Sequence, residues 1–479
     1  MSLESQLAPA RVEPGQRGRW AGVAVVCLGV MMAFVNVSST ISALPAVQND
    51  LHTSPSQLVW ISSAYSLLVV SLVMSAGTLG DLVGRRAVFL SGVAVFAASS
   101  ALAFFSGSAG ALITAQALMG VGGAAILPAS LSIVSHAFAD PRERTGAISV
   151  WASCSGLGLA IGPLTAGVLL DDFGWHAVFL INVVLGLVAL ALTPSLVPES
   201  RYPSRRLDLG GVVLGTIVVA SATYAIIEGA SAGYTAGRIV AVYVVFAVSL
   251  VAFVRVELRH RDPMLDLRLF RSPSFSAVLG VAAATMFGFV GVALLSVLDL
   301  ERVRELGALA TGLRMLVMFG TYILVSAAAA RLVRRVGFLA MLTGGLLIMG
   351  GGALLLLATG PYAGFERMWP GLLVVGIGSG LLVAPSTAAA VNSVPAGQAG
   401  MASAAVNMFR QLGSVLGPSI LGTIVTTGFS RTLVTGRSPA EAFTSAVHTG
   451  LLVGGTTLLA VVVPTALFVR HRAAPAGKD

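Results

Sequence analysis

The residues of this sequence that could do chemistry are a few polar side chains inside long apolar segments. Arg410 and Arg314 each interrupt such a segment. An arginine within a bilayer is costly unless it is paired or hydrated, so each should face a polar partner or a cavity. Asn407 and Gln411 give Arg410 polar neighbours, which favours a binding role. A structural bond from Arg410 to the carbonyl groups of a broken helix is the alternative, and Arg314 is expected to extend toward the outer face.

Carboxyl groups inside the membrane would be the natural carriers of protons. The nearest candidates are Glu228 and Asp299, which come late in their apolar segments. Both positions are near segment ends, so hydrated helix ends are the favoured interpretation. Neither Cys27 nor Cys154 supports a disulfide framework or a metal site, and we expect no metal and no cofactor.

The sequence predicts neither an enzyme nor a transporter driven by ATP hydrolysis in this chain. It contains no phosphate-binding loop of the G-x-x-x-x-G-K-[ST] type. It also offers no recognisable pairing of a nucleophile with a base. We therefore expect a protein that is not an enzyme.

The composition points to a membrane protein. The chain has 479 residues, of which 56% are hydrophobic and only 10% are charged, whereas soluble domains carry about 25% charged residues. The net charge of +9 could suggest nucleic-acid binding. However, the basic residues lie between apolar segments and form no polar module, so no nucleic-acid partner is expected. The partner that the composition predicts is the lipid bilayer.

Fourteen segments are long enough to cross a membrane, which takes about 20 mainly apolar residues. The first is too long for a signal peptide and has no convincing cleavage site, so we expect it to remain as a span. The predicted spans lie near residues 20–45, 56–80, 86–107, 109–134, 144–170, 175–195, 208–229, 238–256, 274–298, 306–330, 337–358, 368–391, 399–427 and 447–469.

The basic residues predict the orientation. If the N-terminus is cytoplasmic, the large majority of the Lys and Arg residues fall in cytoplasmic loops and tails. Cytoplasmic loops of membrane proteins carry such an excess. We therefore expect a multi-pass protein of the inner (plasma) membrane with both termini in the cytoplasm.

An internal repeat relates the two halves of the chain. The pattern G-x-x-x-G-P-x-x-x-G occurs at 158–167 and again at 413–422, and two further matches follow at nearly the same offset: Gly120 with Gly376, and Gly84 with Gly337. The repeat predicts two homologous six-span halves with two inserted spans, an architecture of secondary transporters. A packing surface of small residues is the alternative. The expected division is a tail at 1–19, a bundle at 20–200, two inserted spans at 201–272, a bundle at 273–470 and a tail at 471–479.

The loop after the second span contains a motif that could latch one conformation. Its residues, which we call the latch motif, are Gly77, Asp81, Gly84, Arg85 and Arg86. The glycines permit a tight turn. The carboxylate of Asp81 could reach either arginine or the start of a neighbouring helix. An ordinary basic cytoplasmic loop is the alternative, but the complete string resembles the signature loop of the major facilitator superfamily.

Further motifs resemble the fourteen-span drug:proton antiporter family of that superfamily. They include ISALPAVQNDL in the first span, FGWHAVFLINVVLG in the sixth and MASAAVNMFRQLGSVLG in the thirteenth. The resemblance implies an all-helical major facilitator fold that exports amphipathic drugs, antibiotics or secondary metabolites in exchange for protons. In that family the residues Gly158, Gly162, Pro163 and Gly167 are associated with exporters. We call them the hinge motif and expect a kinked, closely packed hinge between the halves.

Two positions depart from that family. An acidic residue usual in the first span is Asn36 here, and an arginine usual in the fourth span is Gln116. Because acid and base are lost together, we expect the two neutral side chains to compensate each other. We hypothesise that Asn36, Gln116, Asn407 and Arg410 line a substrate cavity for an amphipathic molecule, of which an anion is one option.

Three interpretations of the function remain open at this point. The first is an exporter, with Glu228 or Asp299 as its proton site. The second is a transporter not coupled to protons, which Asn36 and Gln116 favour. The third is a membrane sensor or scaffold that no longer transports. We expect a monomer, since nothing in the sequence demands an oligomer.

Overall fold

The computed structural model is helical throughout the part that it describes, without a strand there. Fourteen of its helical segments are long and apolar enough to cross a membrane. This confirms the predicted number of spans. The tails before residue 16 and after residue 469 lie outside the described part, which covers residues 16–138, 140–200, 208–260, 263, 266–394, 399–434, 436 and 438–469.

The first half of the chain contains six spans. Its elements are α1 (Gln16–Leu51), α2 (Pro55–Val83), α3 (Arg85–Phe104), α4 (Ala109–Ala137), α5 (Pro141–Phe173), the short η2 (Trp175–Phe179) and α6 (Leu180–Leu196). The inserted pair is α7 (Leu209–Ala232) and α8 (Gly237–Arg259). The second half contains η3 (Leu267–Arg271), α9 (Pro273–Arg302), α10 (Ala308–Leu355), η4 (Leu356–Ala358), η5 (Phe365–Arg367), α11 (Trp369–Asn392), α12 (Ala399–Leu433) and α13 (Pro439–Phe468).

The segment labelled α10 contains two spans. Its 48 residues are interrupted at Gly337, whose φ of 80° and ψ of 166° are not helical. Gly84, the corresponding residue of the first half, has a φ of 128° and separates α2 from α3. Residues other than glycine rarely adopt such positive φ values. The two glycines therefore make the same sharp turn, as the repeat predicted.

Close helix packing repeats in the same way. A Cβ atom built on Gly376 of α11 would lie 2.5 Å from the Met318 carbonyl oxygen of α10, and one built on Gly120 of α4 would overlap the Tyr65 carbonyl oxygen of α2. Glycine lets two helix backbones approach at such positions. The two halves therefore share both their helix order and this close backbone contact.

Several helices extend beyond the predicted spans. The last span was expected to begin at 447, but α13 begins at Pro439. Ser438 caps it, and its side chain and that of Glu441 form a capping box. The first span was expected to end at 45, but α1 continues through Pro45 to Leu51. Hydropathy underestimates these helices because the turns at these helix ends contain polar residues.

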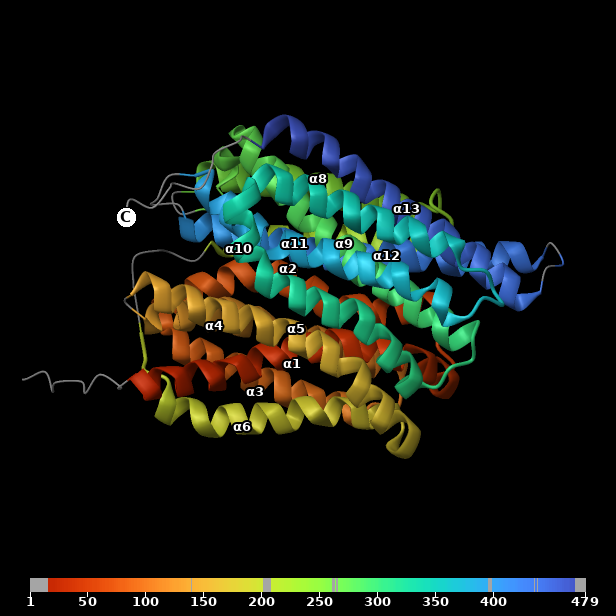
Figure 1. Cartoon of the computed structure of the whole chain (residues 1–479), viewed down its shortest axis with the longest axis horizontal. Coiled ribbons are helices and arrows are strands. Elements are labelled where there is room, and N and C mark those ends of the chain that lie inside the picture. The colour runs from red at the N-terminus through yellow and green to blue at the C-terminus, as the bar shows by residue number, and fades with distance from the viewer. Residues whose placement is uncertain are drawn as a thin grey trace, which may run out of the picture.

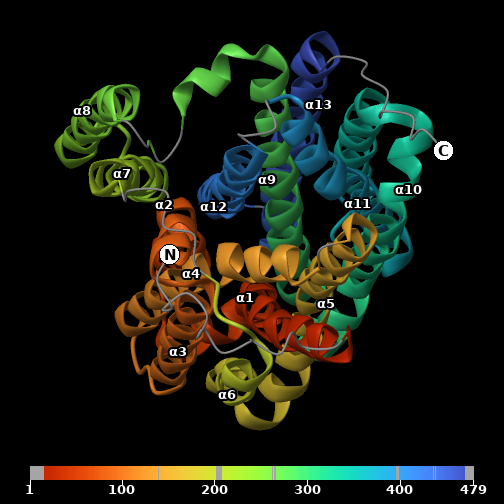
Figure 2. The ribbon, with the colours of Figure 1, turned by 90° about the vertical axis from the view of Figure 1, so that its left-hand side faces the viewer.

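The helices form two groups with the inserted pair on one side. Figure 2 shows α1 and α3–α6 on one side and α9–α13 on the other. The halves meet where α2 packs against α12 and α5 packs against α10. Helix α7 packs against both α2 and α12, whereas α8 packs mainly against α7 and exposes Val244, Val248 and Val251. Such an apolar outer surface suits contact with lipid.

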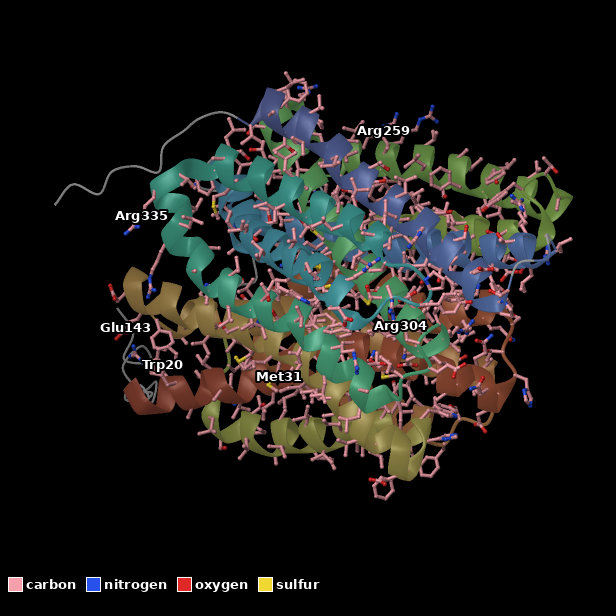
Figure 3. The ribbon with its side chains drawn as sticks, turned by 45° about the vertical axis from the view of Figure 1, so that its right-hand side comes forward. Trp20, Met31, Glu143, Arg259, Arg304 and Arg335 are labelled. Carbon is pink, nitrogen blue, oxygen red and sulfur yellow. The ribbon has the colours of Figure 1, made fainter. Side chains whose placement is uncertain are left out.

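All long helices run roughly along one direction, which is horizontal in Figure 1. The start of α1 and the end of α13 lie at the same end of the bundle (Figure 1). Trp20, Glu143 and Arg335 also lie at that end, whereas Arg304 lies toward the opposite one (Figure 3).

Candidate functional site

Arg410 is held by α11 through uncharged groups. Its Nη2 donates to the hydroxyls of Ser386 at 3.0 Å and Thr387 at 2.7 Å, and also to the Val383 carbonyl oxygen. Its Nη1 donates to Oδ1 of Asn407 at 3.3 Å, one turn earlier on α12. The polar side chains around Arg410 support a binding role. Its bond to a carbonyl oxygen close to Pro385, inside α11, supports the structural interpretation as well.

Two further features distinguish this arginine. Arg410 is partly exposed, yet its Nε is buried and has no hydrogen-bond partner among the described residues. Tyr322 of α10 lies close to it, and the hydroxyl of Tyr322 is hydrogen-bonded to Ser155 of α5. Tyr322 was not predicted from the sequence, although this residue connects Arg410 of the second half to α5 of the first.

Asn36 and Gln116 are in direct contact, as their paired departure suggested. Nδ2 of Asn36 donates to Oε1 of Gln116 at 3.0 Å, and Nε2 of Gln116 donates to the Thr40 hydroxyl at 2.8 Å. Both side chains are buried, at 1% and 0% exposure. A neutral hydrogen-bonded pair thus connects α1 to α4 at this position.

This contact predicts the result of a double-mutant cycle. Asn36→Asp alone should destabilise the protein, because it buries a carboxylate beside a neutral amide. Adding Gln116→Arg should recover much of the loss, with a coupling of about 1–3 kcal/mol between neighbouring positions. The measurement is the thermal unfolding of the four purified proteins in detergent. Strictly additive effects would contradict a direct contact.

The four proposed cavity residues form two separate pairs. Asn36 and Gln116 belong to the first half, and Asn407 and Arg410 to the second, with no contact found between the pairs in the described residues. Two cavities lie between the halves at the same end of the bundle, where α1 and α9 end, with volumes of about 180 and 550 Å³. None of the four residues lines either of them. A shared cavity therefore remains a proposal.

The two carboxyl groups proposed as proton sites have well-defined partners. Oδ2 of Asp299 is 3.0 Å from Nε of Arg304, and Nη1 of Arg304 donates to the Ala363 carbonyl oxygen. Asp299 is only 4% exposed, so the expected hydrated helix end was wrong for this residue: the ion pair allows its burial. Glu228 is half-buried and accepts a hydrogen bond from Nε1 of Trp60 at 3.3 Å.

Other charged groups at this end of the molecule were missed in the sequence. Glu301 and Asp50 line the 550 Å³ cavity from opposite halves. Oε1 of Glu301 is buried without a partner among the described residues, and Asp50 accepts from Nε1 of Trp175 at 2.8 Å. The alternation of acid and base at the end of α9 (DLER) was the available signal. Arg314 stacks over Phe365, 5.4 Å from the ring centroid, in keeping with a side chain directed outward.

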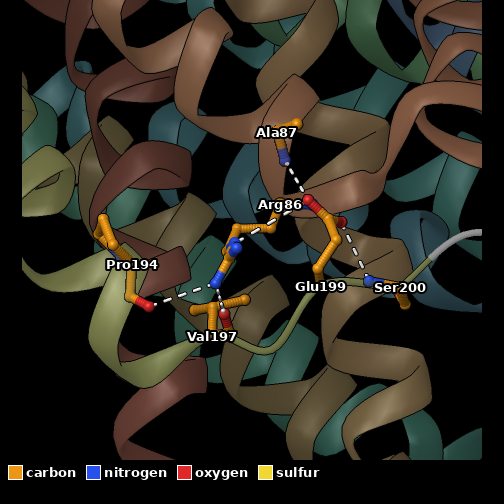
Figure 4. A network of polar contacts seen from close by, with 6 residues as sticks. All are labelled: Arg86, Ala87, Pro194, Val197, Glu199 and Ser200. Atoms are coloured by element: carbon orange, nitrogen blue, oxygen red, sulfur yellow. Dashed lines mark hydrogen bonds and ion pairs between the residues drawn. The ribbon is translucent and has the colours of Figure 1, made fainter. Parts of the chain in front are cut away.

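The latch motif is anchored within its own half. Glu199, just beyond α6, accepts hydrogen bonds from the backbone N–H groups of Arg86 and Ala87 at 3.0 and 3.1 Å (Figure 4). The Arg86 guanidinium lies 3.9 Å from this carboxylate and donates to the Pro194 and Val197 carbonyl oxygens. The carboxylate thus caps the start of α3, where a negative charge is favoured.

The contacts found for the other residues of the latch motif also lie within the first half. Gly84 brings the backbone against Glu199, since a Cβ atom there would lie 2.6 Å from its carboxyl carbon. A Cβ atom on Gly77 would meet Pro128 at 3.6 Å, and the N–H of Arg85 donates to the Ser200 carbonyl oxygen. The side chain of Asp81 lies outside the described part. The sequence did not predict that Glu199 contacts Arg86, because the two residues lie far apart along the chain.

The hinge motif contacts both halves with different residues. Gly158 packs against α1, where its Cβ atom would lie 3.0 Å from the Met31 carbonyl oxygen, and Gly162 also packs there against Ser38. The Pro163 carbonyl oxygen instead faces α10 of the other half, 2.6 Å from a Cβ atom built on Gly312. Gly167 lies one turn further along α5 and is buried. One face of α5 is therefore fixed within its half while another face meets the second half.

The sequence of this chain is similar to those of known transport and resistance proteins. Residues 26–418 match the sequence profile of the Major Facilitator Superfamily. The multidrug resistance protein Stp of Mycobacterium tuberculosis is 34% identical over 407 residues, which cover 85% of this chain and 76% of that protein. The multidrug efflux pump LfrA of Mycolicibacterium smegmatis is 34% identical over 451 residues, with 93% and 88% covered. The methylenomycin A resistance protein of Streptomyces coelicolor is 29% identical, with 86% and 87% covered.

Solved structures share the fold at low sequence identity. A POT family transporter in complex with 5-aminolevulinic acid superposes with a TM-score of 0.68 at 15% identity, covering 94% of this chain and 96% of that chain. A bacterial homologue of the human lysosomal transporter Spinster, in an inward-facing and unoccupied conformation, gives a TM-score of 0.67 at 14% identity, with 97% and 100% covered.

Proposed function

Because the chain belongs to the major facilitator superfamily, we propose that it exports hydrophobic or amphipathic small molecules by alternating access, in exchange for protons. The observation that carries this proposal is Arg410, a partly exposed cation within a span whose hydrogen-bond partners are all neutral. An ionisable residue within a membrane span is by default a candidate functional site. The efflux pumps and resistance proteins among its relatives support export as the direction.

Alternating access would use the contacts where the halves meet. Some of the described contacts involve small groups: the hydroxyls of Ser63 and Ser419 lie 3.1 Å apart, and Gly312 faces the Pro163 carbonyl oxygen. Small side chains permit one helix to shift against another without a large steric penalty. We propose that the two bundles, 20–200 and 273–470, move as units about these contacts, with 201–272 as the inserted pair.

Proton coupling is the finer part of the proposal. Asp299 is the first candidate, because breaking its ion pair with Arg304 would free a carboxylate near the cavity shared by the halves. Glu228 is the second. The alternative is transport without protons, which the neutral pair of Asn36 and Gln116 favours. We further propose a monomer in the inner membrane with both termini in the cytoplasm.

Transport into proteoliposomes with an imposed pH gradient tests this function. We expect accumulation of an amphipathic fluorescent probe that follows the gradient and collapses with a protonophore. Asp299→Asn should then abolish the response to the gradient while leaving downhill exchange of the probe intact. Glu228→Gln serves as the matched neutralisation at the second site. Transport that ignores the gradient would support the uncoupled alternative, and no transport of any amphipathic probe would refute export.

A further inference from the structure

The charge of Arg410 is not balanced by the groups that hold it. Arg86 lies beside the carboxylate of Glu199, and Arg304 lies beside that of Asp299. Arg410 instead contacts a carbonyl oxygen, two hydroxyls and an amide. Neutral dipoles orient a guanidinium but leave its net charge in place, and an uncompensated cation at low dielectric attracts an anion.

The bonding of this guanidinium is also incomplete. An arginine offers five N–H donors, and its Nε–H has no acceptor among the described residues although the atom is buried. The side chain as a whole remains partly exposed. The guanidinium therefore keeps its net charge on a partly exposed side chain, and one of its donors has no acceptor among the described residues.

The polar pair in the other half carries no negative charge. Nδ2 of Asn36 and both polar atoms of Gln116 are used within the group that these residues form with Thr40, whereas Oδ1 of Asn36 is a neutral acceptor without a partner among the described residues. Two described carboxylates between the halves, Asp50 and Glu301, line the 550 Å³ cavity, and Arg410 is not among its lining residues.

We propose that the transported molecules are amphipathic organic anions, whose carboxylate or sulfonate group binds to Arg410. The inference rests on the proposed function and adds the charge of the substrate. Charge-assisted bonds from a guanidinium to a carboxylate are strong and directional, and they would neutralise the charge that the uncharged partners of Arg410 leave in place. Ser386, Thr387 and Asn407 position the guanidinium for this contact.

An anionic substrate also explains how export could proceed although Asn36 stands where the family usually has an acidic residue. A membrane potential that is negative inside drives an anion outward, so the charge of the substrate itself supplies a driving force. Exchange with protons would add to this force and is not required by it.

Three probes of one scaffold test the charge preference. Dansylglycine is anionic, dansylglycinamide is neutral and dansylethylenediamine is cationic. Binding to the full-length protein in lipid nanodiscs, measured by equilibrium dialysis, should favour dansylglycine over both others by about tenfold or more, as for a charge-assisted contact. Equal or tighter binding of the cationic probe by the unmodified protein would overturn the proposal without any variant.

Substitutions then assign the preference to one residue. Arg410→Gln should reduce dansylglycine binding by about tenfold and leave dansylglycinamide unchanged, whereas Arg410→Lys should keep part of the preference. Arg314→Gln is the matched control, because Arg314 also lies within a span and, among the described residues, contacts the Ala310 carbonyl oxygen and the Phe365 ring. A preference that survives in Arg410→Gln, or is lost in Arg314→Gln, would contradict the assignment.

Uptake into proteoliposomes separates this proposal from the proposed function. Dansylglycine should move in response to a membrane potential set by potassium and valinomycin. Movement of the cationic probe in place of the anionic one would overturn the charge preference and leave export standing. Selective binding of dansylglycine without movement of any probe would support the site at Arg410 and refute transport.

Discussion

A disulfide between positions 63 and 419 is expected to stop transport. Ser63 of α2 and Ser419 of α12 belong to different halves, and their hydroxyl oxygens lie 3.1 Å apart in a fully buried contact. Joining them in Ser63→Cys/Ser419→Cys fixes the halves in one arrangement, whereas alternating access requires them to separate at one face. We expect transport after oxidation to fall below about a tenth of the reduced level, and to return with a reductant.

The experiment needs a background without the native thiols. Cys27 and Cys154 are hydrogen-bonded to each other across α1 and α5, so both should first be replaced by alanine. Gly428→Cys/Ala446→Cys is the matched control: it joins α12 to α13 within one half, where the two Cβ atoms would be 3.2 Å apart. Full transport in the oxidised cross-half protein would refute alternating access at this contact.

Replacing Gly413 by alanine is expected to be among the most destabilising single changes in the chain. A Cβ atom at this position of α12 would overlap the Ala283 carbonyl oxygen of α9 and lie 3.0 Å from the Phe287 nitrogen. Backbone atoms cannot rotate away, so α12 must shift from α9. Overpacking of this kind costs about 1–3 kcal/mol and occasionally more. The thermal unfolding temperature in detergent should fall clearly.

Two other glycines provide a graded comparison. Gly158→Ala, the counterpart in α5, should be milder because the closest contact, to the Met31 carbonyl oxygen, is 3.0 Å. Gly280→Ala of α9 meets nothing within 4 Å and should leave stability unchanged or raise it by up to about 1 kcal/mol, since alanine favours helices. Equal unfolding temperatures for the three variants would show that these close contacts do not limit packing.

The local pattern of the sequence was sufficient to predict several features. Span number follows from segment length, because a bilayer core of fixed thickness requires about 20 apolar residues per helix. The equivalence of Gly84 and Gly337 follows from a repeat, and both adopt the positive φ that only glycine adopts readily. Helix ends were less accurate, as at Pro439, because capping residues are polar and resemble loops.

The contact between Asn36 and Gln116 was predicted only in part from the sequence. Their paired departure from a family pattern indicated that they interact, and the hydrogen bond of 3.0 Å connects them. The sequence did not indicate Thr40 as a third member, since a threonine in an apolar span has no distinctive spacing. It likewise could not reveal Glu199 as the partner of Arg86.

What the sequence by itself determined was therefore the membrane class, the fourteen spans, the doubled architecture and the turns at glycine. The tertiary structure alone decided that Arg410 bonds to α11, that Gly158 packs on α1, and that Pro163 faces Gly312. The reason is physical. A span is apolar on nearly all of its surface because lipid and protein interior are alike in polarity, so hydrophobic periodicity does not show which face meets which helix. Partners of polar groups are fixed only when the helices pack.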